Sequence, residues 1–235
     1  GWFAHERGGA PMAEEHRFAP ELVRSLVESD VDHDIGSHTY SHVELDAGYA
    51  TEALARAECE RAIEAAQSLG VAMDAFVFPR NRVGHRETLA ETGFTCYRGQ
   101  TPERTVDGPL RKLARATVVT EPPPLVEPTV DEYGLVNIPA SLYLFGFEGP
   151  ARRALTATVG EPIVRQAKLG IDAASDRSGI CHLWLHPNNL TTEADLTRVR
   201  TICAHIDRMR GATDLTVETM RSVARGVTAE TSSVV

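Results

Sequence analysis

Short apolar segments that each run into a turn residue constrain the fold of this chain more than any other feature. Two of them are Ala75–Phe78 (AFVF), stopped by Pro79, and Ile180–Leu185 (ICHLWL), followed by His186 and Pro187. Runs of roughly 4–8 apolar residues are typical of strands that are buried on both faces of a sheet. Because helical patterns separate these runs, the sequence predicts an α/β protein with a mostly parallel sheet or barrel.

The clearest helix is expected over residues 51–69, which are rich in alanine and end before Gly70. Residues 99–150 hold eight of the 13 prolines, and we interpret them as a long excursion. We expect one domain over residues 1–226 and a polar tail over 227–235. The other expected helices are 20–30, 86–92, 161–175, 191–210 and 218–225, and the other expected strands are 31–35, 94–98, 135–138, 142–145 and 215–217.

The composition excludes several classes of protein. The 235 residues carry 24 basic and 33 acidic side chains, for a formal net charge of −9, which argues against nucleic-acid binding. No apolar run approaches the roughly 20 residues that a membrane span requires. The four cysteines form no CxxC pair, so we expect reduced thiols and a cytoplasmic protein. The oligomeric state is not predicted.

Two histidines stand four residues apart in the segment Gly36–His42 (GSHTYSH), just after a predicted strand. If the segment opens into a helical turn, His38 and His42 lie on one side of it. Two neutral imidazoles suit zinc or a similar divalent cation, and the surrounding hydroxyl side chains suit contacts that orient the ligands. The same spacing also occurs by chance.

Polar residues follow two other predicted strands. His186 ends the strand over 180–185, at a position where an acid or a base is placed in α/β folds. Arg80 and Arg82 follow Phe78 and Pro79, and an arginine there could hold a carboxylate by a bidentate pair. The alternatives are a hydrogen-bonded structural histidine and two solvated arginines. Trp184 and Tyr40 are expected to be core residues.

Together these segments resemble the polysaccharide deacetylase family, also called the NodB-homology domain or carbohydrate esterase family four. GSHTYSH is similar to its metal-binding HxxxH motif, FVFPRNRVG to its third motif, and LWLHP to its last motif. The resemblance implies a distorted (β/α) barrel with seven or eight strands, here incomplete at the N-terminus. It implies a hydrolase that removes N-acetyl groups from a carbohydrate, with a divalent metal, usually Zn²⁺.

By that resemblance His38 and His42 are metal ligands, His186 is the general acid, and Arg80 is a further catalytic residue. The family's first motif, two adjacent aspartates that supply the base and the third ligand, is absent from the chain. We therefore expect these aspartates upstream of Gly1, and this fragment itself to be inactive. Asp32, Asp34 and Asp46 are the substitutes that lie within the chain.

Two other functions stay open. One is a catalytically inactive deacetylase-like barrel that acts as a sugar-binding or interaction module. The other is a metal hydrolase that acts on a different amide. Bound metal together with acetate release would distinguish the carbohydrate deacetylase from both of these alternatives. The identity of the sugar is not predicted.

Overall fold

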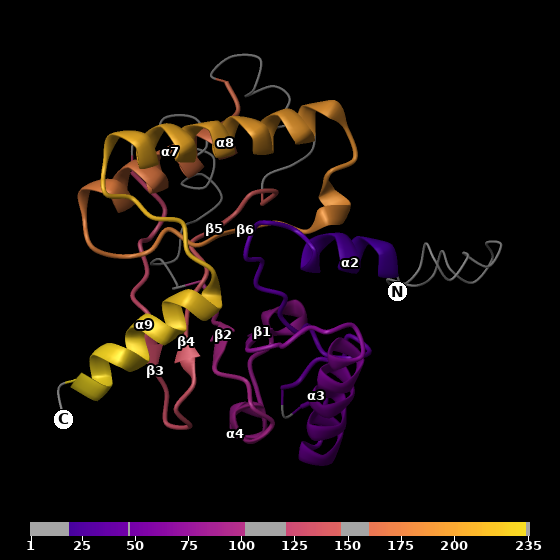
Figure 1. Cartoon of the computed structure of the whole chain (residues 1–235). Helices are drawn as coiled ribbons and strands as arrows, with labels where there is room; N and C mark the ends of the chain where they lie inside the picture. The colour runs from indigo at the N-terminus through magenta and orange to yellow at the C-terminus, as the bar shows by residue number, and fades with distance from the viewer. Residues whose placement is uncertain (1–18, 47, 102–120, 147–159, 234–235) are drawn as a thin grey trace.

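The computed structural model describes residues 19–46, 48–101, 121–146 and 160–233. These residues form a mixed α/β structure in which a small sheet lies between two groups of helices. Figure 1 shows α3 and α4 in the lower part of the view, near β1, and α7 and α8 at the top of the view. Helix α9 crosses in front of the sheet near β3 and β4. The expected α/β class is confirmed, and the described residues contain no closed barrel.

The helices follow the local sequence signals. Helix α3 (Glu52–Gln67) begins after Thr51, whose hydroxyl accepts a hydrogen bond from the backbone N–H of Leu54. Helix α8 (Glu193–Ala212) begins after Thr192, which forms a reciprocal capping box with Asp195. The others are α2 (Pro20–Val27), α4 (Arg86–Glu91), α7 (Pro162–Asp176) and α9 (Met220–Ser233). None of these helices is long and apolar enough to cross a membrane.

The main sheet has the strand order β1-β2-β4-β3. Strand β1 (Ala75–Val77) pairs in parallel with β2 (Cys96–Arg98), and β2 pairs in parallel with β4 (Val136–Asn137). The edge strand β3 (Thr129–Val130) is antiparallel to β4. On the other side of β1, a single parallel bridge joins Ser37 to Phe76.

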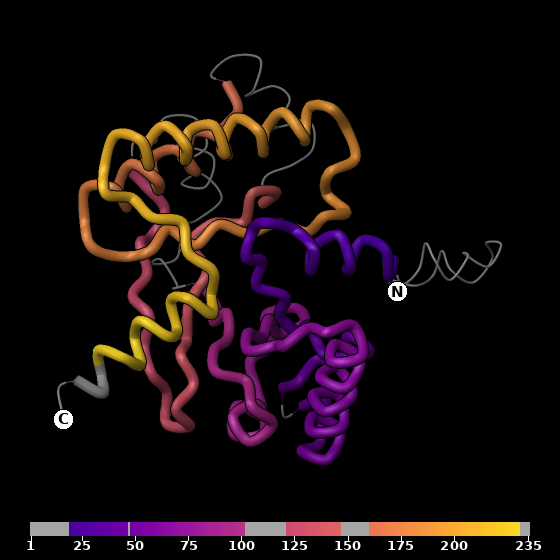
Figure 2. The backbone as a smooth tube through the Cα atoms, in the orientation of Figure 1, coloured from indigo at the N-terminus to yellow at the C-terminus, as the bar shows by residue number. Residues whose placement is uncertain are grey.

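A second pair of strands continues from the first sheet. Strand β5 (Leu142–Tyr143) pairs in parallel with β6 (Leu183–Trp184). The backbone N–H of Ala140 still bonds to Gly99, whereas the next N–H, that of Ser141, bonds to His182. One continuous stretch, residues 136–144, therefore serves both sheets, and Figure 2 traces its course from β4 to β5.

Three clusters of buried residues stabilise this arrangement. The first lies between β1 and helices α3 and α4 and includes Leu45, Phe76, Phe78 and Leu89. The second packs α7 and α8 onto β5 and β6 through residues such as Ala167, Ile171 and Ile202. The third lies beneath α9, where Met220, Val223 and Val227 contact Val136 and Ile138. The first and third clusters thus cover the main sheet, and the second covers the β5–β6 pair.

Several expected elements differ from those observed. Residues 31–35 and 215–217 form no strands: in the first segment pairing begins only at Ser37, and in the second Leu215 packs onto the α7–α8 cluster as coil. Within the expected excursion, the strands expected near 135–138 and 142–145 form as β4 and β5, which pair with β2 and β6. The chain over 102–120 lies outside the described residues. Helix α9 continues to Ser233, through most of the expected polar tail.

Candidate active site

The segment that carries His38 is fixed against strand β1. Backbone hydrogen bonds join Ser37 to Ala75 and to Val77. The preceding residue must be glycine, because a Cβ atom on Gly36 would lie 2.8 Å from the carbonyl oxygen of Ala75. The side-chain Nδ1 of His38 lies 2.7 Å from the carbonyl oxygen of Val77 and donates to it. In neutral His38 the lone pair is therefore on Nε2, which is the atom left for a ligand.

A turn with unusual backbone angles places His42 beside His38. Thr39 and His42 both have left-handed backbone angles, with φ of 63° and 62°. Such angles are unfavourable for residues other than glycine, above all for the β-branched threonine. The two imidazole rings lie edge to face, with centroids 4.9 Å apart. The structure thus brings together the two expected metal ligands by a turn that is strained at two positions.

Glu58 of helix α3 holds this turn in place. Its carboxylate accepts hydrogen bonds from the backbone N–H and the hydroxyl of Ser41, both at 2.7 Å. The side chain is buried, with 7% exposure, next to the core residue Cys59. A buried carboxylate with two short hydrogen bonds fixes the residue directly before His42. The sequence analysis did not identify Glu58 as a site residue.

His186 follows strand β6 and lies on an aromatic cluster. The Trp184 ring stacks on Tyr143 with centroids 4.2 Å apart, and the His186 ring lies edge-on to both at 5.4 and 5.9 Å. Asn189 ties the turn together, because its Oδ1 accepts from the Tyr143 hydroxyl at 2.8 Å and from the His186 N–H at 3.2 Å. Trp184, which was expected to be a core residue, is only partly buried and belongs to this aromatic cluster beside His186. Tyr40, also expected in the core, is 55% exposed.

The three histidines influence one another electrostatically. Burial lowers the pKa of His38, against the opposing hydrogen bond to Val77, and the charges of His42, Arg98 and His186 lower it further. Burial also lowers the pKa of His186, followed by the charges of Arg98 and His42. His38 and His186 are therefore mostly neutral near pH 7, so that their ring nitrogens can bind a metal or accept a proton.

Arg98 contacts the aromatic cluster beside His186, whereas the expected catalytic residue Arg80 pairs with Glu44. The Arg80 side chain is 55% exposed, and its Nε lies 3.2 Å from Glu44, which also pairs with Arg82 at 2.7 Å. Arg98 ends strand β2 with its guanidinium carbon 4.2 Å from the centre of the Trp184 ring. Burial lowers the pKa of Arg98 to about 10. Its sequence signal was an arginine at the end of the apolar run FTCYR.

The three candidate aspartates have other partners. Asp34 accepts a hydrogen bond from the backbone N–H of Arg221 at 2.8 Å, and Asp32 lies 3.6 Å from the same arginine. Asp46 accepts from Arg82 at 2.8 Å. Across the described ranges, no group of three or more His, Cys, Asp and Glu side chains is arranged to hold a metal ion. His38 and His42 are thus the pair of nitrogen donors available there.

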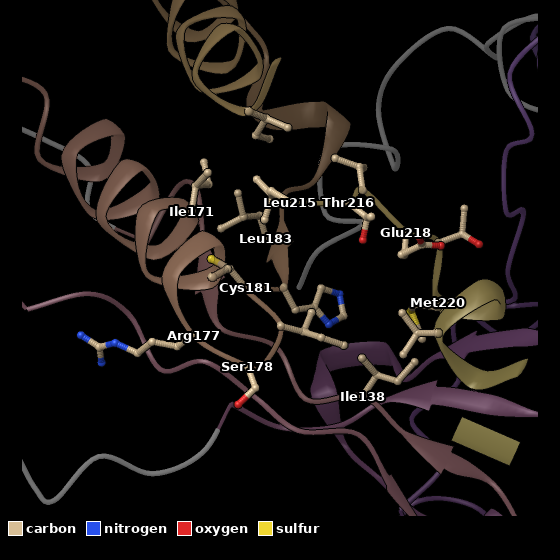
Figure 3. Close-up of a pocket in the computed structure, with 18 of the residues that line it drawn as sticks. Ile138, Ile171, Arg177, Ser178, Cys181, Leu183, Leu215, Thr216, Glu218 and Met220 are labelled. Carbon is tan, nitrogen blue, oxygen red and sulfur yellow. The ribbon is translucent and has the colours of Figure 1, made fainter. Parts of the chain in front are cut away.

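A separate cavity of about 520 Å³ lies between β6, helix α7 and the start of α9. Figure 3 shows Ile171, Cys181 and Leu183 on one side of it and Glu218 and Met220 on the other. His38, His42 and His186 do not line this cavity. Its walls are mostly apolar, so the histidine cluster is the stronger candidate for chemistry.

Comparison with known protein families finds none that matches the chain. A search of curated proteins likewise finds no significant match.

Proposed function

We propose that this chain is a metal-dependent hydrolase that removes N-acetyl groups from a carbohydrate, on a (β/α) fold of the NodB-homology type. One observation carries the proposal: His38, beside His42, bonds to Val77, and the strand partner of Val77, Arg98, lies over the Trp184 ring that contacts His186. The resemblance of the three motifs to those of polysaccharide deacetylases adds to it. The parallel pairings of Ser37 with β1, of β1 with β2, of β2 with β4 and of β5 with β6 are the kind of pairing that a (β/α) barrel uses.

The residues fit a divalent metal in part. His38 offers a free Nε2 because its Nδ1 donates to Val77, and His42 presents a second imidazole 4.9 Å away. Two imidazoles are suitable donors for Zn²⁺, which in catalytic sites takes three protein ligands and one open position. When bound, such a metal would polarise an amide carbonyl and lower the pKa of a water molecule.

His186 would protonate the departing amine. Its side chain is exposed, so that a substrate can reach it, and Asn189 fixes its backbone. Because its pKa is lowered, His186 holds a proton weakly and is a strong donor once protonated. Arg80 would act from a distance, through Glu44, as a residue that orders the loop after β1.

The second candidate is a non-catalytic barrel that binds a sugar. It is favoured by a single observation, namely that the described residues hold no third metal ligand beside the histidine pair. The Trp184–Tyr143 stack would then serve as the binding surface.

Metal analysis tests the ligand assignment. After loading with Zn²⁺ and dialysis, His38→Ala and His42→Ala should each bind the metal at least about 10–100-fold more weakly than the parent chain. His85→Ala is the matched control, since its Nε2 donates to the carbonyl of Ala50. Metal content at the parental level in both variants would show that these histidines are not ligands.

Acetate release from a chitin-type oligosaccharide tests the reaction. We expect His186→Ala to keep its metal and to lose roughly 10²–10⁴ in rate. The assay is run on the 235-residue chain. Metal binding without acetate release would favour the sugar-binding module over the hydrolase.

A further inference from the structure

Arg98 is a buried cation to which the described residues offer no carboxylate. The residue is 8% exposed, and no hydrogen-bond partner of its Nε lies in the part of the chain that the structure describes. One terminal nitrogen donates to the Asn81 side chain at 2.9 Å. No ion pair involving Arg98 occurs within the described ranges, and burial alone accounts for its lowered pKa. Burying a charge without a counter-charge is unfavourable, so its retention requires an explanation.

Arg198, the other arginine that is buried among the described residues, provides a comparison. The Arg198 side chain is 1% exposed and also lies over an aromatic ring, 4.3 Å from the centre of Phe145. Unlike Arg98, it has carboxylates of Glu161 and Asp195 at 3.7 and 4.0 Å. The same fold therefore supplies acidic partners to an arginine that has a structural role.

The surroundings of Arg98 hold it in one orientation. Arg80 and Asn81 both have left-handed backbone angles, with φ of 51° and 55°, and this turn carries the Asn81 amide to the guanidinium. Gln100 donates to the backbone carbonyl of Asn81 at 3.1 Å and braces the turn. On its flat side the guanidinium rests on Trp184. Arg98 is thus held in one orientation, and its Nε–H is a donor for which the described residues provide no acceptor.

A second unused donor belongs to the same stacked pair. The indole Nε1 of Trp184 is buried and has no hydrogen-bond partner among the described residues. Two buried N–H groups without acceptors on two residues in contact indicate a missing acceptor group. That group is best an anion, because one of the donors carries a positive charge.

We propose that Arg98, Asn81 and Trp184 form a subsite for the carboxylate of a ligand, beside the histidine cluster. A carboxylate matches the single positive charge of the subsite, whereas a phosphate carries nearly two charges at neutral pH. If the proposed function holds, the substrate is an acidic sugar that bears both an N-acetyl group and a carboxylate. The subsite itself does not depend on hydrolysis.

Binding is tested with sodium glucuronate in the presence of a chelator, so that neither metal nor turnover is needed. The chain has two tryptophans, and a Trp2→Phe background leaves Trp184 as the sole tryptophan, whose fluorescence is followed. We expect saturable binding of glucuronate, at least 10-fold weaker binding in Arg98→Met, and no response to glucose. Arg200→Met, which changes an arginine that is 70% exposed on α8, is the matched control and should bind as the parent does.

Thermal unfolding distinguishes a ligand carboxylate from one supplied by the chain itself. Arg98→Met removes a buried charge and keeps much of the apolar volume, so its midpoint should equal or exceed that of the parent. A lower midpoint, together with no glucuronate binding by the parent, would overturn the subsite and assign Arg98 to an internal ion pair. Equal glucuronate binding by parent and variant, or tighter binding of inorganic phosphate, would also overturn it. Glucuronate binding without acetate release from any substrate would leave the subsite standing and count only against the hydrolase.

Discussion

The turn that carries His38 and His42 and the turn that carries His186 lie at the same end of the sheet but are held by different contacts. The first is fixed by hydrogen bonds, from His38 to Val77 and from Ser41 to the buried Glu58. The second rests on the stacked rings of Trp184 and Tyr143. Directional hydrogen bonds fix a nitrogen in one orientation, as a metal ligand requires, whereas stacking leaves a proton donor more freedom to move.

Removing the charge of Glu58, which holds the turn with His38 and His42, should have the largest effect on stability. In Glu58→Gln only one oxygen can accept from Ser41, so we expect the free energy of unfolding to fall by about 1.5–3 kcal/mol. Affinity for Zn²⁺ should fall by about 10–100-fold, because His42 follows the freed segment. Chemical denaturation and metal titration measure both, and Glu60→Gln, an exposed position on the same helix, is the control. An unchanged denaturation midpoint would show that Glu58 does not hold the turn.

A smaller change, in the contacts of the turn that carries His186, should leave His38 and His42 unaffected. Tyr143→Phe keeps the ring on Trp184 but removes the hydroxyl that donates to Asn189. We expect a loss of about 0.5–1.5 kcal/mol in unfolding free energy and no change in Zn²⁺ affinity. Tyr133→Phe, in an exposed turn, is the comparison. A parallel loss of metal would mean that the two turns are coupled and not independent.

The smallest effect should appear as a dependence of stability on pH. Burial lowers the pKa of His182, which donates from Nδ1 to the carbonyl of Pro139 at 3.0 Å. The unfolded chain, where a histidine titrates near 6.5, then binds the proton more readily than the folded one, so stability is present above about pH 6.5 and is lost as the pH falls. His182→Gln should show a shallower decline in thermal midpoint between pH 7 and pH 5. A decline as steep as that of the parent would assign the effect to other groups.

Local sequence signals predicted most of the elements. Helix α3 was expected from its alanine content and from the glycine that follows it, because propensities and caps act within a few residues. Strands β1 and β2 were expected from their apolar runs. The strand expected over 31–35 did not form as such, since a strand requires a neighbour and only Ser37 is paired there.

The site was predicted in part, and its missing members share a cause. His38, His42 and His186 stand in recognisable motifs at strand ends. Glu58 and Arg98 have no local motif, because their roles depend on Ser41 and Trp184, which are far away in sequence. Asp34 shows the converse, since its proximity to the histidines in sequence suggested a role in the site, whereas it bonds to Arg221, 187 residues away.

The stretch of backbone shared by the two sheets limits how the length of this chain can vary. Val136 pairs with β2, and Leu142 pairs with β6. The number of residues between them therefore fixes the register of one pairing relative to the other. One added or deleted residue there would exchange the two faces of β5, because side chains alternate along a strand. Tyr143 would then turn away from Trp184. Insertions are therefore expected in relatives at the turn around Gly134, whereas the spacing between β4 and β5 should be invariant.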